Sequence, residues 1–430
     1  MTELVQRFLA DFAANDRALR AMGYDAASQR LELLQQEAAL SADRIWIKAE
    51  PANQDHKTLL ARIGVVHSGY RDHGRINRPT AIRKVGGEYW VASYYQRIAR
   101  FDANWTFLGW WPGAWGADHA AGQYSNVEDF AVDEANDRLF AALGGRHRVM
   151  AFQLSDGSHL WTWGDGTPGD YADNRPNTPR SVELLPNGNV AVAVWNGAGP
   201  AGVAAGYVAE LDGTAGTAVA ARLERKTDGF PWNGEVDRPI RIRLLNGRLY
   251  VSLYYLNGGM VGVFDPTTWQ PIETYTQPQG WDVQSVSPWG LCLDDPDPAA
   301  ATELVVCANS PKVIVALGLT DHDYKWHAGE QRWDDRAGAD NIPGELHDIR
   351  DVLPLGGGLF AVADYGNNRI MVLPRFNTMS VPYTVAMPTG YRLVTDGLPE
   401  GFDPATYELA VKLNRLHQVG PLYLPLERMP

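Results

Sequence analysis

The stretch Leu359-Phe-Ala-Val-Ala-Asp-Tyr-Gly-Asn-Asn-Arg-Ile-Met-Val-Leu373 decides the fold of this chain. It holds an apolar run, a polar turn and a second apolar run, which is the pattern of two antiparallel strands joined by a short connection. A small sheet repeated along a chain cannot bury both of its faces alone, so neighbouring copies must stack. Matching pairs of runs occur at Tyr89–Ser93 with Arg97–Phe101, Leu139–Leu143 with Arg148–Phe152, Val190–Val194 with Tyr207–Leu211, Leu249–Leu253 with Val261–Phe264, and Leu304–Ala308 with Lys312–Leu317.

Six such units fit between residues 60 and 373, which predicts an all-β, six-bladed β-propeller. The last unit has only three strands of its own, and Leu60–Val66 is expected to supply its fourth, which would close the ring and leave no open sheet edge. The innermost strands are expected to begin near Pro79, Asp129, Pro179, Pro239, Pro288 and Asp348. The outermost strands are expected at Thr106–Trp110, Leu160–Trp163, Ala218–Leu223, Ile272–Tyr275 and Tyr324–Ala328.

Two further regions flank the predicted propeller. Residues 1–59 form an expected N-terminal helical extension, because apolar residues recur at helical spacing within 2–41. Residues 374–430 are expected to form a C-terminal helix over Asp403–His417, with Asp403 as its N-cap and Pro404 at its first position. An extended, apolar, proline-rich arm is expected at 419–430.

The composition narrows the classes of partner. A net charge of -13 disfavours a surface that follows nucleic-acid phosphates or anionic lipid, so we expect neither nucleic-acid binding nor membrane insertion. The N-terminal residues lack a basic segment followed by an apolar one, so we expect synthesis in the cytoplasm without a signal peptide. Both cysteines, Cys292 and Cys307, lie inside apolar strand-like runs and are expected to be buried free thiols.

The segment Val362-Ala-Asp-Tyr-Gly-Asn-Asn-Arg-Ile-Met-Val372 resembles the core of an NHL repeat, which carries a similar Ala-Asp-x-x-Asn-x-Arg-Ile-x-x-Phe run. The other copies keep the strand pattern with fragments such as Arg-Ile-Ala-Arg-Phe-Asp102. The resemblance covers about residues 60–373 as architecture. It implies a six-bladed propeller, and it implies little about activity, because propellers host binding modules, lyases and lactonases alike.

Charged residues at the starts of the innermost strands are the first candidates for function. Inner strands line the central channel of a propeller, so these side chains are expected to meet around one mouth and to bind a polar ligand, or else to pair with one another. Arginine stays charged, so the set favours binding over proton transfer. The channel-binding candidates are Arg78, Glu128, Asp129, Arg180, Arg238, Asp348 and Arg350.

A metal site is the alternative reading of the same region. Carboxylates and a histidine near the channel, namely Glu128, Asp129, His347 and Asp348, are candidate ligands for one divalent cation such as calcium. Such a site would suit a metal-dependent enzyme of the lactonase or lyase kind. The leading expectation is that the protein has no cofactor.

Interface candidates lie in two places. Trp115 and Trp333 occupy loop-like surroundings, where exposed tryptophan anchors partners or stacks on sugars. The C-terminal arm adds Leu422, Tyr423, Leu424 and Leu426.

The leading hypothesis is therefore a non-enzymatic structural or binding subunit of a large assembly. We expect it to contact other protein subunits through its N-terminal helices and C-terminal arm, and to be a phage virion or tail component. A module that binds a surface glycan through its tryptophans is a further alternative. The sequence shows no Gly-x-Ser-x-Gly nucleophile elbow and no Walker or Rossmann glycine run.

Overall fold

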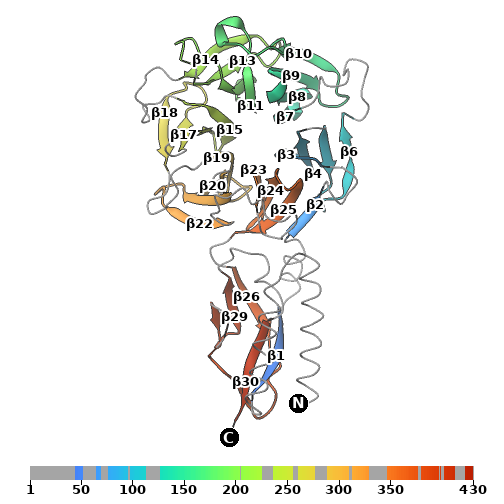
Figure 1. Ribbon diagram of the computed structural model, residues 1–430, viewed down its shortest axis with the longest axis vertical. Helices are drawn as coiled ribbons and strands as arrows, with labels where there is room; N and C mark the ends of the chain where they lie inside the picture. The colour runs from blue at the N-terminus through green and yellow to red at the C-terminus, as the bar shows by residue number, and fades with distance from the viewer. Residues whose placement is uncertain are drawn as a thin grey trace. The chain divides into compact units, whose positions relative to one another are not determined.

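The computed structural model describes residues 44–51, 64–68, 76–94, 97–112, 126–203, 205–224, 236–254, 260–276, 288–308, 312–328, 346–375, 379–396, 398, 401–411 and 422–429. Six four-stranded antiparallel sheets are arranged around one axis, which confirms the six-bladed propeller (Figure 1). A further six-stranded sheet belongs to a second unit. The NHL type of repeat, as distinct from the propeller architecture, stays a prediction.

The innermost strands are β3 (Pro79–Val85), β7 (Val127–Asp133), β11 (Asn177–Leu184), β15 (Pro239–Leu245), β19 (Pro288–Leu293) and β23 (Ile349–Gly356). The second strands are β4 (Glu88–Ser93), β8 (Arg138–Leu143), β12 (Val190–Asn196), β16 (Arg248–Leu253), β20 (Glu303–Ala308) and β24 (Leu359–Asp364). The third strands are β5 (Ile98–Phe101), β9 (Arg148–Gln153), β13 (Tyr207–Leu211), β17 (Met260–Phe264), β21 (Val313–Gly318) and β25 (Arg369–Pro374). Their starts agree with the predicted ones within a few residues.

The outermost strands are β6 (Phe107–Trp111), β10 (His159–Trp163), β14 (Ala218–Glu224), β18 (Pro271–Tyr275), β22 (Tyr324–Ala328) and β2 (Gly64–Ser68). Strand β2 pairs with β25 of the last blade, so the early segment closes the ring as predicted, a few residues later than Leu60–Val66. Short 3-10 turns lie at Glu134–Asn136, Gly144–Arg146 and Tyr171–Asp173.

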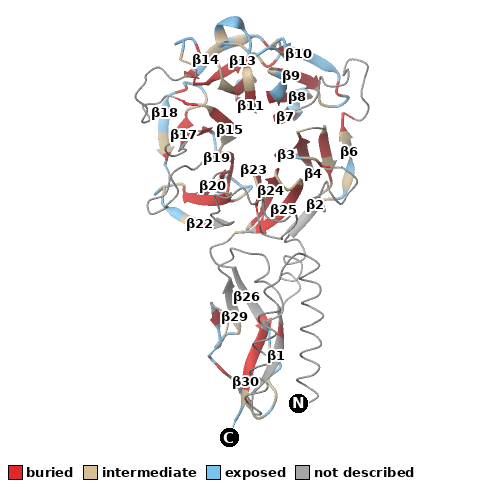
Figure 2. Cartoon of the chain, viewed as in Figure 1, coloured by how far each residue is buried: buried red, intermediate tan, exposed pale blue. Residues whose placement is uncertain are grey.

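Apolar side chains fill the space between neighbouring blades, and the inner three strands are the most buried (Figure 2). One such cluster joins Phe130 and Phe152 of the second blade to Trp90 and Trp111 of the first. This contact between blades is why a repeated small sheet becomes stable only in an array.

The segment that decides the fold is stabilised by a buried ion pair. The Asp364 carboxylate accepts hydrogen bonds from Arg369 Nε at 2.7 Å, Asn367 Nδ2 at 2.9 Å and the His347 amide at 2.8 Å. Both Asp364 and Arg369 are fully buried. The aspartate and arginine of the repeat-like motif therefore fix the turn between β24 and β25 to the start of β23.

Recurrent aspartates shape the connections between third and fourth strands. Asp102 Oδ1 accepts the amides of Asn104 and Thr106, and Asp265 Oδ1 accepts those of Thr267 and Thr268. These are local side-chain turns of the kind that aspartate favours, and the bonds from the backbone amides lower the pKa of both carboxyls.

The second unit contains β1 (Arg44–Pro51), β26 (Met379–Thr384), β27 (Tyr391–Leu393), β28 (Phe402–Asp403), β29 (Glu408–Val411) and β30 (Leu422–Arg428), in the order β27-β30-β1-β26-β29-β28. The N-terminal strand β1 thus pairs along its length with the C-terminal strand β30. The expected C-terminal arm is extended, and it is an interior strand of this sheet.

The helix expected over Asp403–His417 is wrong in its described part. Residues 402–411 form the hairpin of β28 and β29, in which Asp403 Oδ1 accepts the amide of Ala405. An aspartate followed by Pro is as typical of a turn as of a helix start, so the capping signal was ambiguous. The helices expected within 2–41 lie outside the described residues. Among the described residues, no helix is long and apolar enough to span a bilayer.

Candidate functional site at the central channel

The six innermost strands share one irregularity that sets the geometry of the channel. Each innermost strand contains an equivalent five-residue segment, and these segments begin at Pro79, Val127, Pro179, Pro239, Pro288 and Ile349. The register of pairing with the second strand shifts between the first and third residues of each segment, which is the signature of a β-bulge. The third positions are Ala81, Asp129, Ser181, Arg241, Gly290 and Asp351, and the fifth are Arg83, Ala131, Glu183, Arg243, Cys292 and Leu353. The intervening fourth residue is apolar and buried in every blade.

A left-handed residue precedes this segment in the five blades where it is described. The φ angles are 55° at Arg78, 68° at Asn126, 61° at Thr178, 47° at Arg238 and 54° at Asp348. A β-branched residue such as Thr178 adopts this conformation only under strain, which often marks functional positions. The carbonyls of Arg78 and Arg238 accept the amides of Tyr94 and Tyr254, so the turn also positions two aromatic residues at the same end of the blades.

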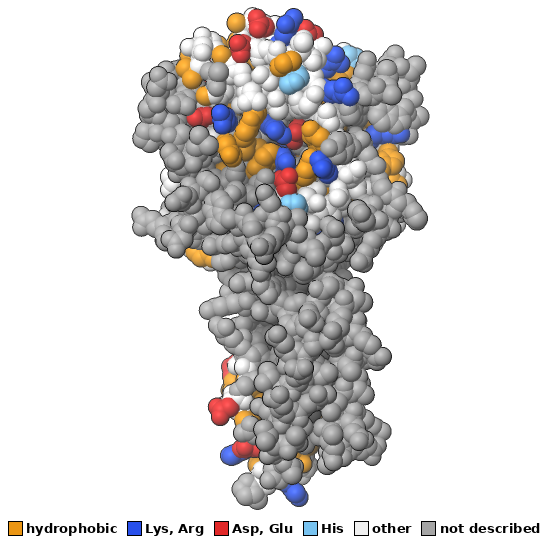
Figure 3. All heavy atoms as spheres, in the orientation of Figure 1, with side chains coloured by type: hydrophobic (Ala, Val, Ile, Leu, Met, Phe, Trp, Pro, Cys, Tyr) orange, Lys and Arg blue, Asp and Glu red, His pale blue; other side chains and the backbone are white. Residues whose placement is uncertain are grey.

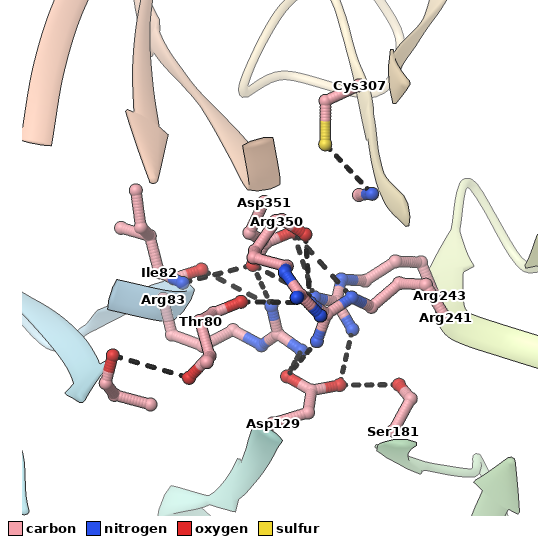
Figure 4. Close-up of polar contacts among 12 residues, drawn as sticks. Thr80, Ile82, Arg83, Asp129, Ser181, Arg241, Arg243, Cys307, Arg350 and Asp351 are labelled. Atoms are coloured by element: carbon pink, nitrogen blue, oxygen red, sulfur yellow. Dashed lines mark hydrogen bonds and ion pairs between the residues drawn. The ribbon is translucent and has the colours of Figure 1, made fainter. Parts of the chain in front are cut away.

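Two carboxylates and three guanidiniums meet at the axis (Figure 4). Asp129 lies 2.8 Å from Arg83, 3.0 Å from Arg241 and 2.9 Å from Arg243. Asp351 lies 3.3 Å from Arg83 and 3.0 Å from Arg243. Both aspartates are fully buried. With Glu183, these residues are called the axial ion cluster below.

Arg241 ties four blades together across the channel. It belongs to the fourth blade and is 2% exposed. Its Nη2 donates to the carbonyl oxygens of Thr80 and Arg350, each at 2.9 Å, and its Nη1 donates to the carbonyl of Glu128 at 3.4 Å. These carbonyls belong to the first, sixth and second blades, so a single side chain supplies hydrogen bonds to the backbone of three other blades.

The charges within the axial ion cluster balance one another. Burial by itself would raise the pKa of Asp129, but Arg241, Arg243 and Arg83 outweigh it and hold that pKa well below its usual range. The same carboxylates raise the pKa of Arg243, although burial opposes them. The Ser181 hydroxyl donates to Asp129 and accepts the Ile242 amide at 3.0 Å, and Asp351 accepts the Ile82 amide at 3.0 Å.

Glu183 is the weakly held member of the cluster. Its Oε2 lies 3.8 Å from Arg243 and 3.9 Å from Arg83, and accepts no hydrogen bond from the described residues. Burial raises the pKa of Glu183 to about 6, since the two guanidiniums only partly offset the loss of water. This carboxyl group therefore titrates near neutral pH.

The predicted channel residues separate into two levels. Asp129 belongs to the axial ion cluster, whereas Glu128 and Asp348 lie nearer the strand entries and pair with Arg180 at 2.5 Å and Arg350 at 2.8 Å. Arg78 is exposed and donates to the Tyr365 hydroxyl at 3.3 Å. Arg238 occupies the equivalent left-handed position of the fourth blade.

The candidate metal ligands are not brought together. Asp129 is bound by arginines, Glu128 and Asp348 each pair with a different arginine, and the His347 amide is bound to Asp364. Within the described ranges no group of three or more His, Cys, Asp and Glu is arranged to hold a metal ion. A cation site in this protein stays a prediction.

Arginines alternate with aromatic rings at the strand-entry end of the channel. The Arg350 guanidinium lies 3.7 Å from the centroid of Trp289 and 4.3 Å from that of Tyr365. Arg180 lies 5.3 Å from Trp289. Arg180 also lies over the Trp195 ring, and Trp195 contacts Tyr254. Arg78 lies over the Tyr365 ring. We call Arg78, Arg180, Arg350, Trp195, Tyr254, Trp289 and Tyr365 the arginine–aromatic belt.

The interface candidates fall partly outside this region. Trp115 and Trp333 lie outside the described residues. Tyr423, Leu424 and Leu426 are buried within the sheet of the second unit, and Leu422 begins the same strand β30. In the propeller, Trp111, Trp161 and Trp163 are buried, which removes them from a glycan-binding surface.

Both thiols are buried and free, as predicted. Cys307 Sγ accepts the amide of Gly290 at 2.9 Å, and burial raises the pKa of both cysteines. Thiols in such surroundings are poor nucleophiles because the thiolate is disfavoured.

Sequence reasoning missed most of the axial ion cluster, namely Arg83, Glu183, Arg241, Arg243 and Asp351. A signal existed. Aligning the segments that begin at Pro79, Val127, Pro179, Pro239, Pro288 and Ile349 shows that the third and fifth positions collect these charges between apolar neighbours. The β-bulge was not predicted, and it changes which residues lie on the same side of the strand. Without it, the third and fifth positions could not be assigned to the channel.

No family model matches the sequence, and no curated protein matches it significantly. Among solved structures, hydrazine synthase of Kuenenia stuttgartiensis is similar over 70% of this chain and 96% of its own, with 11% identity and a TM-score of 0.44. The β-propeller domain of Myceliophteria thermophila Cps50 (Swd1) is similar over 69% and 97%, with 10% identity and a TM-score of 0.44. The WD40 domain of Neurospora crassa Pan2 is similar over 68% of this chain and 74% of its own, with 10% identity and a TM-score of 0.40. Likenesses this weak carry no argument about activity.

Proposed function

We propose that this chain is a non-enzymatic binding subunit, in which the channel axis is structural and the strand-entry end of the channel contacts a protein partner. One observation carries the proposal. The guanidiniums of Arg241 and Arg243 lie beside Asp129 and Asp351, where an enzyme of the metal-dependent kind would need its cation. The charged groups of the axis therefore pair with one another between blades, and this pairing stabilises the ring.

Catalysis needs a group that can change its protonation or its ligands during the reaction. Arginine keeps its proton at all ordinary pH values, and Asp129 is held ionised by three arginines. Glu183 titrates near neutral pH, but it lies within the same cluster of opposite charges. The axis is therefore suited to stability, and the strand-entry end of the channel, where Arg78 is exposed and Arg180 is 20% exposed, is the part of the channel that a partner could reach.

The broader setting is a multi-subunit assembly. Strand β1 precedes the propeller in the sequence and β30 follows it, and the two pair within a second sheet whose edges are β27 and β28. We propose that this second unit, with the segment 1–41, makes the subunit contacts. The narrower proposal of a phage virion or tail component is tested by electron microscopy of particles that contain this chain.

Native mass spectrometry of the full chain, purified under mild conditions from the cells that make it, tests the function. We expect protein subunits in fixed stoichiometry and no change in melting temperature on chelation. A lone monomer that carries one divalent cation per chain and melts at a lower temperature after chelation would refute the proposal and support the enzyme alternative.

A further inference from the structure

Neighbouring blades are joined by a hydrogen bond at the entry to the inner strand. The donor is the backbone amide of the left-handed residue that precedes this strand. At the entry to the second blade, Asn126 donates to the Tyr94 carbonyl at 2.6 Å, and at the entry to the fourth blade, Arg238 donates to the Ala205 carbonyl at 2.5 Å. A backbone carbonyl keeps its lone pairs at every ordinary pH, so these two links do not respond to protons.

Side chains are the acceptors at two other entries. At the entry to the first blade, the Arg78 amide donates to Asn368 Oδ1 of the sixth blade at 3.0 Å. At the entry to the third blade, the Thr178 amide donates to His147 Nδ1 of the second blade at 3.1 Å. Of these four links, the one at His147 alone has a titratable acceptor.

His147 and Asn368 occupy the same place in their blades. Each ends the turn after the second strand and directly precedes the third strand, β9 or β25. Both have left-handed backbone, with φ angles of 50° and 53°, which is a conformation that His and Asn adopt more readily than most residues. Each also donates its own amide to the carbonyl three residues earlier, at 3.2 Å. The fold thus builds the same link twice, once with a permanently neutral amide and once with an imidazole.

The link at His147 requires a neutral ring. A ring nitrogen accepts a hydrogen bond only while it carries no proton, so Nδ1 accepts from Thr178 when the ring proton is on Nε2. Uptake of a proton from solvent at Nδ1 turns the acceptor into a donor and sets two N–H groups against each other. Thr178 is β-branched with a φ of 61°, a conformation that persists only where its surroundings hold it. Loss of this bond therefore favours relaxation of the entry to β11.

The surroundings of His147 leave the ring without a carboxylate that would stabilise its charged form. The ring is half-buried, and burial lowers the pKa of His147. Within the described part of the chain, no carboxylate forms an ion pair with this imidazole. Figure 3 shows histidine and charged side chains at the surface of one propeller face, where solvent supplies protons. The charged groups on the elements around this turn are Arg146 and Arg148 beside His147 itself, Glu128 of β7 bound to Arg180 of β11, and Asp165 bound to Arg175 in the loop after β10.

We propose that His147 is a pH-sensitive link between the second and third blades, which holds the entry to β11 at neutral pH and releases it in acid. Thr178 stands two residues before Arg180 of the arginine–aromatic belt, so the release begins at the strand-entry end of the channel. The entry to the first blade, held by Asn368, should not change. The link belongs to the fold of the single chain and does not depend on the proposed function.

Hydrogen exchange of the full chain tests this link, followed by mass spectrometry from pH 7.5 to pH 4.5 and corrected for the intrinsic exchange rate at each pH. In the wild type we expect peptides that cover Thr178 to lose protection by at least ~3-fold as the pH falls, because one net hydrogen bond is lost. Peptides that cover Arg78 should keep their protection. His147→Asn reproduces the acceptor of the equivalent link and should keep protection at Thr178 over the whole range.

Two further variants separate the link from general effects of acid. His147→Phe lacks an acceptor and should give low protection at Thr178 at every pH. His159→Asn replaces an exposed histidine whose ring contacts the Thr162 hydroxyl in the same blade, and should keep the wild-type pH dependence.

The comparison of wild type with His147→Asn decides the outcome, and it stands even if His147→Phe misfolds. Glu183 lies on the same strand as Arg180 and is present in both proteins, so its titration cancels. Protection at Thr178 that stays constant in the wild type at every pH would overturn the proposal. The same loss of protection in wild type and in His147→Asn would overturn it equally, because the response would then come from another group.

Discussion

Replacing Asp129 by alanine should strongly destabilise the propeller. The carboxylate lies within 3.0 Å of three guanidinium nitrogens and is fully buried. Removing it changes the axial ion cluster from three cations with three anions to three cations with two. Two unit charges about 4 Å apart interact by about 4 kcal/mol at an effective dielectric constant near 20.

The variant no longer bears the free-energy cost of burying a carboxylate. The net loss of folding free energy is therefore smaller than the sum of three such ion pairs. Breaking a buried ion pair by removing one partner typically costs about 3–5 kcal/mol. For a unit of this size we expect the melting temperature to fall by roughly 6–10 °C. The assay is thermal unfolding followed by circular dichroism at neutral pH.

Two companion variants make the result interpretable. Asp129→Asn keeps the shape and removes the charge, so it should lose nearly as much as the alanine variant. Lys325→Ala breaks the exposed pair with Asp321 and should leave the melting temperature nearly unchanged, because water screens a surface ion pair. An Asp129→Ala protein that melts within about 2 °C of wild type would refute the view that the cluster holds the blades together.

Three other substitutions probe separate parts of the fold. Burial raises the Glu183 pKa to about 6, so the stability that comes from its protonated form is fully present below pH ~4.3 and is lost as pH rises through 6. Glutamine carries no charge at any pH, so Glu183→Gln should raise the melting temperature by more at pH 8 than at pH 5. Asp364→Ala should cost about 3–5 kcal/mol by leaving Arg369 buried without its carboxylate partner. Gly290→Ala should cost about 1–3 kcal/mol, since the added Cβ would lie 2.5 Å from Asp351 Cα.

Each of these has an outcome that contradicts it. A parallel pH dependence of melting in wild type and Glu183→Gln would show that Glu183 does not titrate between pH 5 and 8. Wild-type stability of Asp364→Ala, measured by urea unfolding, would remove the structural role given to the repeat-like motif. Gly290→Ala with unchanged stability would mean that the inner strands separate easily at the axis.

The blade pattern was readable from sequence because each strand pair buries apolar residues on both faces of its sheet, as at Leu359–Leu373. The closing strand was also predictable, since an incomplete last blade needs a partner. The C-terminal hairpin at 402–411 was not, because Asp-Pro is compatible with both a turn and a helix start.

The candidate site was predictable only in outline. Arg180, Arg350 and Glu128 were found because they stand near the starts of inner strands, where a channel must be lined. Arg241 was missed because its contacts are Asp129 and backbone carbonyls on other blades, and no local pattern encodes them. Long-range contacts of this kind depend on ring closure.

The most direct test of the account is a crystal structure determined with manganese in the crystals, using anomalous scattering to locate the ion. We predict no anomalous peak at the axis, and density for Arg241 that reaches the carbonyl oxygens of Thr80 and Arg350. A peak about 2.0–2.6 Å from carboxylate oxygens of both Asp129 and Asp351, with Arg241 and Arg243 turned away, would contradict the claim that arginine is the cation of this channel.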